Sequence, residues 1–345
     1  MRGKIHLIAP AGSCKPFFQT VGLAGADALL NLFRQFTPEY QITGEADLLN
    51  ASEDELHGGR RDDVERARDI EMALADSDTC TIIGVRGGAW FARILPQINF
   101  NVLTRRQSIV HVFGFSELTG LVNIVAASKQ ARGYYDMGPA FLTYGMKRFA
   151  AQYRQVTHET SPPLTPDEWM LRNWRNEFAR YCRQVVAISQ EDCDICVDAR
   201  LARGNVGNNV EFRAVGGNLT VLSTLLGSPF ADAIDPHDRW LVLEDFNDKP
   251  ERFDRFLAHL TLAGYWQKCR GVLLGDFHQG DADLRPAILE MLDFHIPSGC
   301  PCPILVTDSI GHIWPMTPLP LNRSGMLERL PGGSFRLTWN RKLCD

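Results

Sequence analysis

The sequence has no apolar run that approaches the ~18 consecutive residues of a membrane-spanning helix. Its first residues, 1–8, pass directly into a short strand-like segment and lack the long apolar core of a secretory signal. We therefore expect a cytoplasmic protein that has no membrane partner.

The sequence also lacks an excess of positive charge. Its 36 Lys and Arg residues are outnumbered by 41 Asp and Glu residues, and the formal net charge is −5. The charges are scattered along the chain, whereas a nucleic-acid groove requires clustered Lys and Arg. We expect no nucleic-acid partner.

Motifs for nucleotide cofactors and metals are absent or incomplete. Neither the G-x-G-x-x-G fingerprint nor the G-x-x-x-x-G-K-[ST] loop occurs, so we expect no cofactor. Cys193 and Cys196, with Cys300 and Cys302, could supply four zinc thiolates, but they lack the paired spacing of structural zinc sites. Nine cysteines is an odd number in a large chain, and we expect buried free thiols and no metal.

The chain has 345 residues and an ordinary globular composition, and it is long enough for about two domains. Strand-like and helix-like segments alternate along it. This alternation predicts an α/β fold with a parallel, flavodoxin- or Rossmann-like sheet. The first half has predicted strands at 5–10, 41–43, 80–85 and 109–113, and predicted helices over 17–33 and from residue 62.

The pattern changes after residue 153. Residues 154–215 contain Pro-rich and Gly/Asn-rich stretches, and we interpret them as a linker with an insertion between domains at 1–153 and 216–345. The last part has predicted strands at 240–245, 271–276, 303–307 and 335–339, and a helix with Phe253, Phe256, Leu257 and Leu260 on one face.

Ser116 lies between the buried-type strand at 109–113 and a helical pattern that starts at Leu118. A serine on such a turn can act as a nucleophile, because the N–H groups of the following helix can stabilise an oxyanion. The alternative is that Ser116 only caps the helix. Arg86-Gly87-Gly88 similarly ends a predicted strand, and its N–H groups can line an anion pocket or simply form a turn.

Glu244 lies at the end of the predicted strand at 240–245, and His312 lies in the turn after the predicted strand at 303–307, so the chain contains the three residue types of a hydrolase triad. A solvated glutamate and a structural histidine are the alternatives. Sequence spacing does not show whether residues this far apart meet.

With these residues, the chain resembles the LD-carboxypeptidase and microcin C self-immunity family of serine peptidases along nearly its whole length. The matching segments, in order, are Ile8-Ala9-Pro10, the segment from Arg66 to Asp69, Arg86-Gly87-Gly88, Gly114-Phe115-Ser116-Glu117, Gly138-Pro139, Gly216-Gly217-Asn218-Leu219, Leu243-Glu244-Asp245 ahead of Asp254-Arg255, and Gly311-His312.

The resemblance implies a Ser-Glu-His peptidase with an N-terminal parallel-sheet domain, a smaller C-terminal mixed α/β domain, and catalytic groups from both. It implies Ser116 as nucleophile, His312 as base and acid, and Glu244 as the orienting carboxylate. The backbone N–H groups of Gly88 and Glu117 would form the oxyanion hole. A homodimer is the usual state in the family.

The chain departs from the family pattern in two places. Glu117 stands where Asp is usual, and Ala89-Trp90 stands where Tyr-Gly is usual. These departures favour one alternative, a non-catalytic ligand-binding relative, whereas the retained triad residues favour an enzyme. An α/β-hydrolase esterase is a further alternative, but its G-x-S-x-G elbow requires glycine where this chain has Leu118.

The substrate is expected to be a small peptide or a peptide–nucleotide conjugate. Our leading hypothesis is an LD-carboxypeptidase that acts on muramoyl tetrapeptides, and the alternative is an immunity-type amidase that cleaves aminoacyl or peptidyl adenylates. The candidate substrate contacts are Gly87, Asn218, Trp169 and Trp174. The two tryptophans could stack on a nucleobase or simply pack against their own domain.

Overall fold

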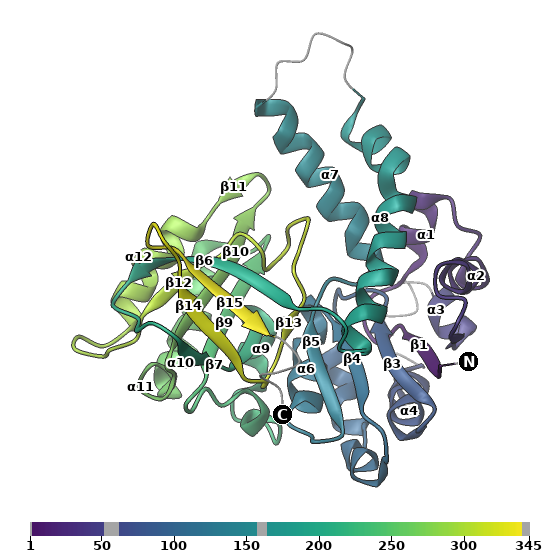
Figure 1. The fold of residues 1–345 in the computed structure, drawn as a ribbon, viewed down its shortest axis with the longest axis horizontal. Coiled ribbons are helices and arrows are strands. Elements are labelled where there is room, and N and C mark those ends of the chain that lie inside the picture. The colour runs from purple at the N-terminus through teal and green to yellow at the C-terminus, as the bar shows by residue number, and fades with distance from the viewer. Residues whose placement is uncertain (1, 52–61, 157–163, 340–345) are drawn as a thin grey trace. The chain divides into compact units, whose positions relative to one another are not determined.

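The computed structural model describes residues 2–51, 62–156 and 164–339, and its contacts divide the chain into two compact units, Met1–Asp192 and Cys193–Asp345 (Figure 1). The segment 154–215, predicted as a linker with an insertion, contributes a long helix to the first unit and two strands to the second. The predicted domain boundaries, 1–153 and 216–345 with a linker and insertion at 154–215, stay a prediction.

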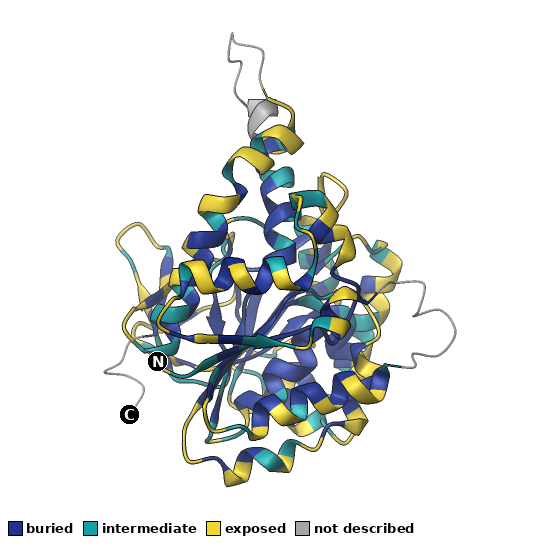
Figure 2. Cartoon of the chain, turned by 90° about the vertical axis from the view of Figure 1, so that its right-hand side faces the viewer, coloured by how far each residue is buried: buried dark blue, intermediate teal, exposed yellow. Residues whose placement is uncertain are grey.

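The first unit is built on a parallel sheet in which β2, β1, β3, β4 and β5 are neighbours in that order. Every residue of β4 is buried, as expected of a central parallel strand, whereas only one of the four residues of β2, at the edge of the sheet, is buried; Figure 2 colours the chain by this burial. The strands are β1 (Lys4–Ile8), β2 (Gln41–Gly44), β3 (Thr79–Gly84), β4 (Val110–Gly114) and β5 (Ala131–Tyr135). The predicted N-terminal parallel sheet is confirmed, and the more specific flavodoxin- or Rossmann-like description stays a prediction.

The helices of the first unit follow the predicted alternation, with one correction. The single helix predicted over 17–33 is two helices, because Gly22 adopts φ 70° and ends the first, and Gly25 adopts φ 121° before the second. The helices are α1 (Lys15–Val21), α2 (Ala26–Phe36), α3 (Ala46–Asn50), α4 (Asp63–Ala75), α5 (Phe91–Ile94), α6 (Thr119–Ala126), α7 (Pro139–Val156) and α8 (Pro166–Ser189), with 3₁₀ turns at η2 (Leu95–Gln97), η3 (Phe100–Arg105) and η4 (Ser116–Leu118).

The second unit is built on a mixed, nearly barrel-shaped sheet. Its strands run in the order β7-β14-β15-β6-β12-β10-β9-β8, with β11 paired to β10. The two ends of this order, β7 and β8, are joined through Arg213 alone. The strands are β6 (Ile195–Arg203), β7 (Val210–Phe212), β8 (Ala214–Asn218), β9 (Trp240–Phe246), β10 (Gly271–Gln279), β11 (Ala282–Asp283), β12 (Ile304–Val306), β14 (Gly325–Arg329) and β15 (Phe335–Trp339).

Within this sheet, β8, β9, β10 and β12 are mutually parallel. Asn218 ends β8 and Glu244 lies in β9. Phe253, Leu257 and Leu260 are buried on one face of α10, as predicted. The remaining elements are α9 (Leu219–Leu225), α10 (Pro250–Leu262), α11 (Tyr265–Lys268), α12 (Arg285–His295), η5 (Ala231–Ile234) and the short β13 (Leu319–Pro320).

The cysteine prediction was partly wrong. Cys302 is buried, but Cys193 and Cys196 are exposed, because Cys196 takes an outward position in the alternating pattern of β6. Across the part of the chain that the structure describes, no three His, Cys, Asp or Glu side chains form a group that could bind a metal ion. Over the same described residues, no helix combines the length and the apolar character needed to cross a bilayer.

Candidate active site

Ser116 begins the 3₁₀ turn η4 directly after β4, and its φ is 55°. A positive φ is uncommon for a residue with a side chain and costs conformational energy. The capping alternative was wrong, because the N-cap residues of η4 and α6 are Phe115 and Leu118, and neither makes a side-chain cap bond. Ser116 therefore occupies a strained strand-to-helix turn.

Backbone contacts hold this turn in place. The Ser116 N–H donates to the Tyr135 hydroxyl at 3.2 Å, and the Thr119 hydroxyl donates to the Ser116 carbonyl at 2.7 Å. The Leu118 N–H donates to the Phe115 carbonyl at 3.0 Å. Tyr135 ends the neighbouring strand β5, so the sheet itself fixes the backbone that carries the serine.

The glycine pair predicted to approach a ligand lies against the Ser116 turn. A Cβ atom at Gly87 would lie 3.2 Å from the Ser116 Cβ and 3.4 Å from the Glu117 N, so this close approach favours glycine. The Gly87 carbonyl accepts a hydrogen bond from the Gly12 N–H at 3.0 Å. Because the N–H of a trans peptide points opposite to its carbonyl, the Gly88 N–H points away from Gly12.

The side chain of Glu117 links the two turns. Its Oε1 accepts a hydrogen bond from the Phe91 N–H at 2.9 Å. Burial raises the pKa of Glu117 to about 7, and the backbone N–H groups of Phe91 and Ala92 oppose part of that rise. Trp90 adopts φ 78° and remains 38% exposed.

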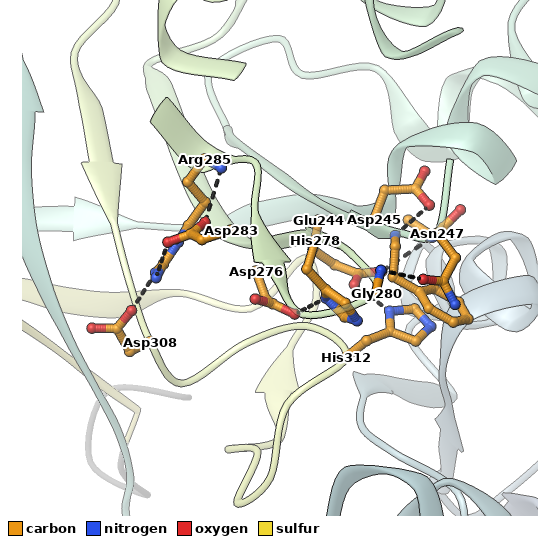
Figure 3. A network of polar contacts seen from close by, with 12 residues as sticks. Glu244, Asp245, Asn247, Asp276, His278, Gly280, Asp283, Arg285, Asp308 and His312 are labelled. Atoms are coloured by element: carbon orange, nitrogen blue, oxygen red, sulfur yellow. Dashed lines mark hydrogen bonds and ion pairs between the residues drawn. The ribbon is translucent and has the colours of Figure 1, made fainter. Parts of the chain in front are cut away.

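In the second unit, Glu244 and His312 form a buried carboxylate–imidazole pair (Figure 3). The Oε2 of Glu244 lies 2.6 Å from the His312 Nδ1, and the exposed fractions of the two residues are 0% and 1%. The solvated alternative for Glu244 was therefore wrong. The second carboxylate oxygen accepts a hydrogen bond from the Asn218 side chain at 3.2 Å.

Asn218 and Phe246 complete the surroundings of this pair. Asn218 caps α9, because its Oδ1 accepts a hydrogen bond from the Val221 N–H at 3.1 Å. The Phe246 ring stacks on the His312 imidazole with 3.6 Å between ring centroids. The imidazole is thus held at one nitrogen and over one face.

Near this pair lie Asp245, Asp276 and His278, to which the sequence analysis assigned no role (Figure 3). The Asp276 Oδ2 lies 2.6 Å from the His278 Nδ1, and both side chains are buried (Figure 3). Burial and the charge of Glu244 raise the pKa of Asp245 to about 6. The sequence could have indicated the contact between Asp276 and His278, because residues two apart on a strand share one face of the sheet.

The two tryptophans behave differently from each other. Trp174 is buried on α8, with its ring 6.0 Å from Phe17 and 5.2 Å from Phe178 between centroids. Trp169 is half-buried and lies 6.0 Å from Phe149. These contacts favour the packing alternative for Trp174, and a substrate contact by either residue stays a prediction.

Both halves of the chain match one protein family. Residues 5–135 match the LD-carboxypeptidase N-terminal domain, and residues 212–327 match the LD-carboxypeptidase C-terminal domain. The chain belongs to the LD-carboxypeptidase family. This family includes MccF-like proteins, and membership removes the α/β-hydrolase esterase alternative.

The chain is similar both to murein peptide carboxypeptidases and to MccF. The probable murein peptide carboxypeptidase of Bacillus subtilis is 25% identical over 270 residues, which cover 77% of this chain and 74% of that protein. The structure of muramoyltetrapeptide carboxypeptidase from Oxalobacter formigenes has a TM-score of 0.63 and 21% identity, covering 98% of each chain. A structure of MccF in complex with glutamyl sulfamoyl guanosine has a TM-score of 0.64 and 15% identity, covering 98% of this chain and 96% of that one.

Proposed function

We propose that the protein is a serine carboxypeptidase that hydrolyses the amide on the carboxyl side of an L–D linkage, with muramoyl tetrapeptides as the substrate class. The buried contact between Glu244 and His312 carries this proposal. A histidine held by a carboxylate at Nδ1 keeps Nε2 for proton transfer, which is the arrangement that a serine nucleophile needs.

This contact and the Ser116 turn support the following roles. Ser116 Oγ attacks the substrate carbonyl carbon while the Nε2 of His312 takes the hydroxyl proton. The amide bond breaks as His312 returns that proton to the leaving nitrogen, and the terminal amino acid departs. Water then hydrolyses the acyl-enzyme ester by the same route, and Glu244 stabilises the imidazolium in both steps.

The N–H groups of Gly88 and Glu117 are the proposed oxyanion donors. Their turns lie within van der Waals reach of each other at Gly87, and the Gly88 N–H points away from Gly12. Such preorganised donors act on the charge that develops in the transition state, and loss of one typically costs ~10²–10³ in kcat. No cofactor enters this mechanism.

The muropeptide substrate is supported by the B. subtilis and O. formigenes relatives, whose names specify murein peptide and muramoyltetrapeptide carboxypeptidases. The second candidate, an amidase for aminoacyl nucleotide conjugates, is supported by the MccF complex with glutamyl sulfamoyl guanosine. The burial of Trp174 removes one of the two aromatic faces that would favour that candidate. We therefore place the muropeptide substrate first.

The test is a side-by-side assay of the purified protein on an L–D tetrapeptide ending in D-alanine and on an aminoacyl sulfamoyl adenosine. We expect release of D-alanine. Ser116→Ala should lower the rate by ~10⁴ or more, whereas the exposed Ser77→Ala should match the wild type. Cleavage of the adenosine conjugate alone would establish the second candidate, and inactivity on both substrates would favour a non-catalytic ligand-binding protein. The expected homodimer and cytoplasmic location stay predictions.

A further inference from the structure

We propose that Glu117 is a positioning residue whose carboxylate clamps residues 88–91 against the nucleophile turn. The oxyanion donor at Gly88 would thereby be held in place. This role rests on the proposed function, and it assigns to the Glu117 side chain a task distinct from that of its backbone N–H.

The clamp is a contact between two segments distant in sequence. The backbone of Glu117 belongs to the η4 turn and moves with Ser116, while its Oε1 accepts the Phe91 N–H at 2.9 Å. Phe91 begins α5, and the first N–H groups of a helix have no partner within the helix. The Glu117 carboxylate supplies the partner that the Phe91 N–H lacks within α5.

The clamped segment needs such support because its backbone is strained. Gly88 adopts φ 116°, which glycine tolerates, but Trp90 adopts φ 78°, which an aromatic residue rarely adopts. An unrestrained Trp90 would relax to negative φ and shift the neighbouring peptide groups. The strain therefore persists only if contacts on both sides of Trp90 hold the segment.

Those contacts exist on both sides. Before Trp90, the Gly12 N–H holds the Gly87 carbonyl at 3.0 Å. After Trp90, Glu117 holds Phe91. On the outer side, the Arg93 guanidinium lies 5.5 Å from the centre of the Trp90 ring and 3.1 Å from the Asp63 carboxylate. Gly88 lies between the two inner anchors, so loss of Glu117 would release the end of the segment nearest to Trp90.

The functional consequence is specific to the transition state. An oxyanion donor that moves by a fraction of an ångström loses most of its effect on the developing charge, while ground-state binding changes little. Removal of the carboxylate should therefore lower kcat far more than it raises KM. General loss of structure would instead lower the amount of active enzyme and leave both constants of the remaining enzyme unchanged.

The experiment compares Glu117→Ala, Glu117→Gln and the double variant Glu117→Ala with Trp90→Gly, with the exposed Glu65→Ala as matched control. We expect Glu117→Ala to lower kcat ~10–100-fold with KM within about threefold of the wild type. Glu117→Gln keeps an acceptor oxygen and should lose less. Trp90→Gly removes the strain at φ 78°, so it should restore part of the lost kcat in the double variant.

A second measurement does not depend on catalysis. Hydrogen exchange of the Phe91 and Ala92 amides should be at least tenfold faster in Glu117→Ala than in the wild type and unchanged in Glu65→Ala. If the wild type is inactive on both substrates but this exchange pattern holds, the proposed function fails and the clamp stands. Unchanged exchange, an unchanged kcat in Glu117→Ala, or a double variant no better than the single one would overturn the clamp. Glu117→Gln supplies the same comparisons if Glu117→Ala fails to fold.

Discussion

The Nδ1 of His312 lies 2.6 Å from the Oε2 of Glu244, and the exposed fraction of each residue is 1% or less. A buried carboxylate without a partner is costly, and so is a buried imidazole that loses its acceptor. The two residues therefore depend on each other for their position, and the catalytic proposal can be tested through either one.

Glu244→Gln should lower kcat/KM by ~10²–10⁴ while the protein stays folded. The amide keeps the shape of the side chain but removes the negative charge and can present an N–H to Nδ1, which fixes the wrong tautomer of His312. Steady-state kinetics with Glu251→Gln as control checks this, since Glu251 is exposed at the start of α10. Equal activity in both variants would remove Glu244 from the proposed triad.

Asn218→Ala should lower both stability and activity, because Asn218 caps α9 and donates to Glu244. Loss of an N-cap typically costs about 1 kcal/mol of unfolding free energy. Asn99→Ala is the matched control, since Asn99 caps η3 in the first unit through the Asn101 N–H. Denaturant unfolding should show similar losses for both variants, and only Asn218→Ala should lose activity. Full activity in that variant would argue against a role for Asn218 at Glu244.

The raised pKa of Asp245 predicts a stability that declines as pH rises. Burial and the charge of Glu244 bring this pKa to about 6 from 3.8, so the folded state binds the proton more tightly than the unfolded state. The full stabilisation is present below pH 3.8, and it is lost as pH rises through 6. The unfolding free energy falls by about 3 kcal/mol over this range. Asp245→Asn does not titrate, so its unfolding free energy should fall less between pH 4 and about pH 7.5. Parallel curves for the two proteins would contradict the shift.

Trp174→Ala should cost about 3–5 kcal/mol of unfolding free energy, because it empties a space lined by Phe17 and Phe178. Trp169→Ala should cost much less, since Trp169 is half-buried. Trp174→Phe keeps most of the packing and should leave KM for either substrate unchanged. A large rise in KM for the adenosine conjugate in Trp174→Phe, at wild-type stability, would instead indicate a stacking role.

Local patterns in the sequence were sufficient to predict β1, β2, β3 and β4 of the first unit and β9, β10, β12 and β15 of the second, whereas the other strands were not predicted. β4 and residues 240–243 of β9 are nearly continuous apolar runs that are buried, and β15 alternates between more and less buried residues as predicted. The error at 17–33 arose because apolar residues continue with helical spacing across a break. Gly22 and Gly25 make that break through their backbone angles, which hydrophobic periodicity does not register.

For the site, the sequence by itself determined that Ser116 lies on a turn between a buried strand and a helix, and that Glu244 lies near the end of a strand, which is β9 in the structure. Only the tertiary structure decided that Glu244 and His312, on segments far apart in the chain, meet at 2.6 Å. It also decided that Phe246 covers the imidazole and that Glu117 reaches Phe91. The physical reason is that periodicity and turn chemistry are local properties, whereas the partner of a side chain depends on strand order and on the register between strands.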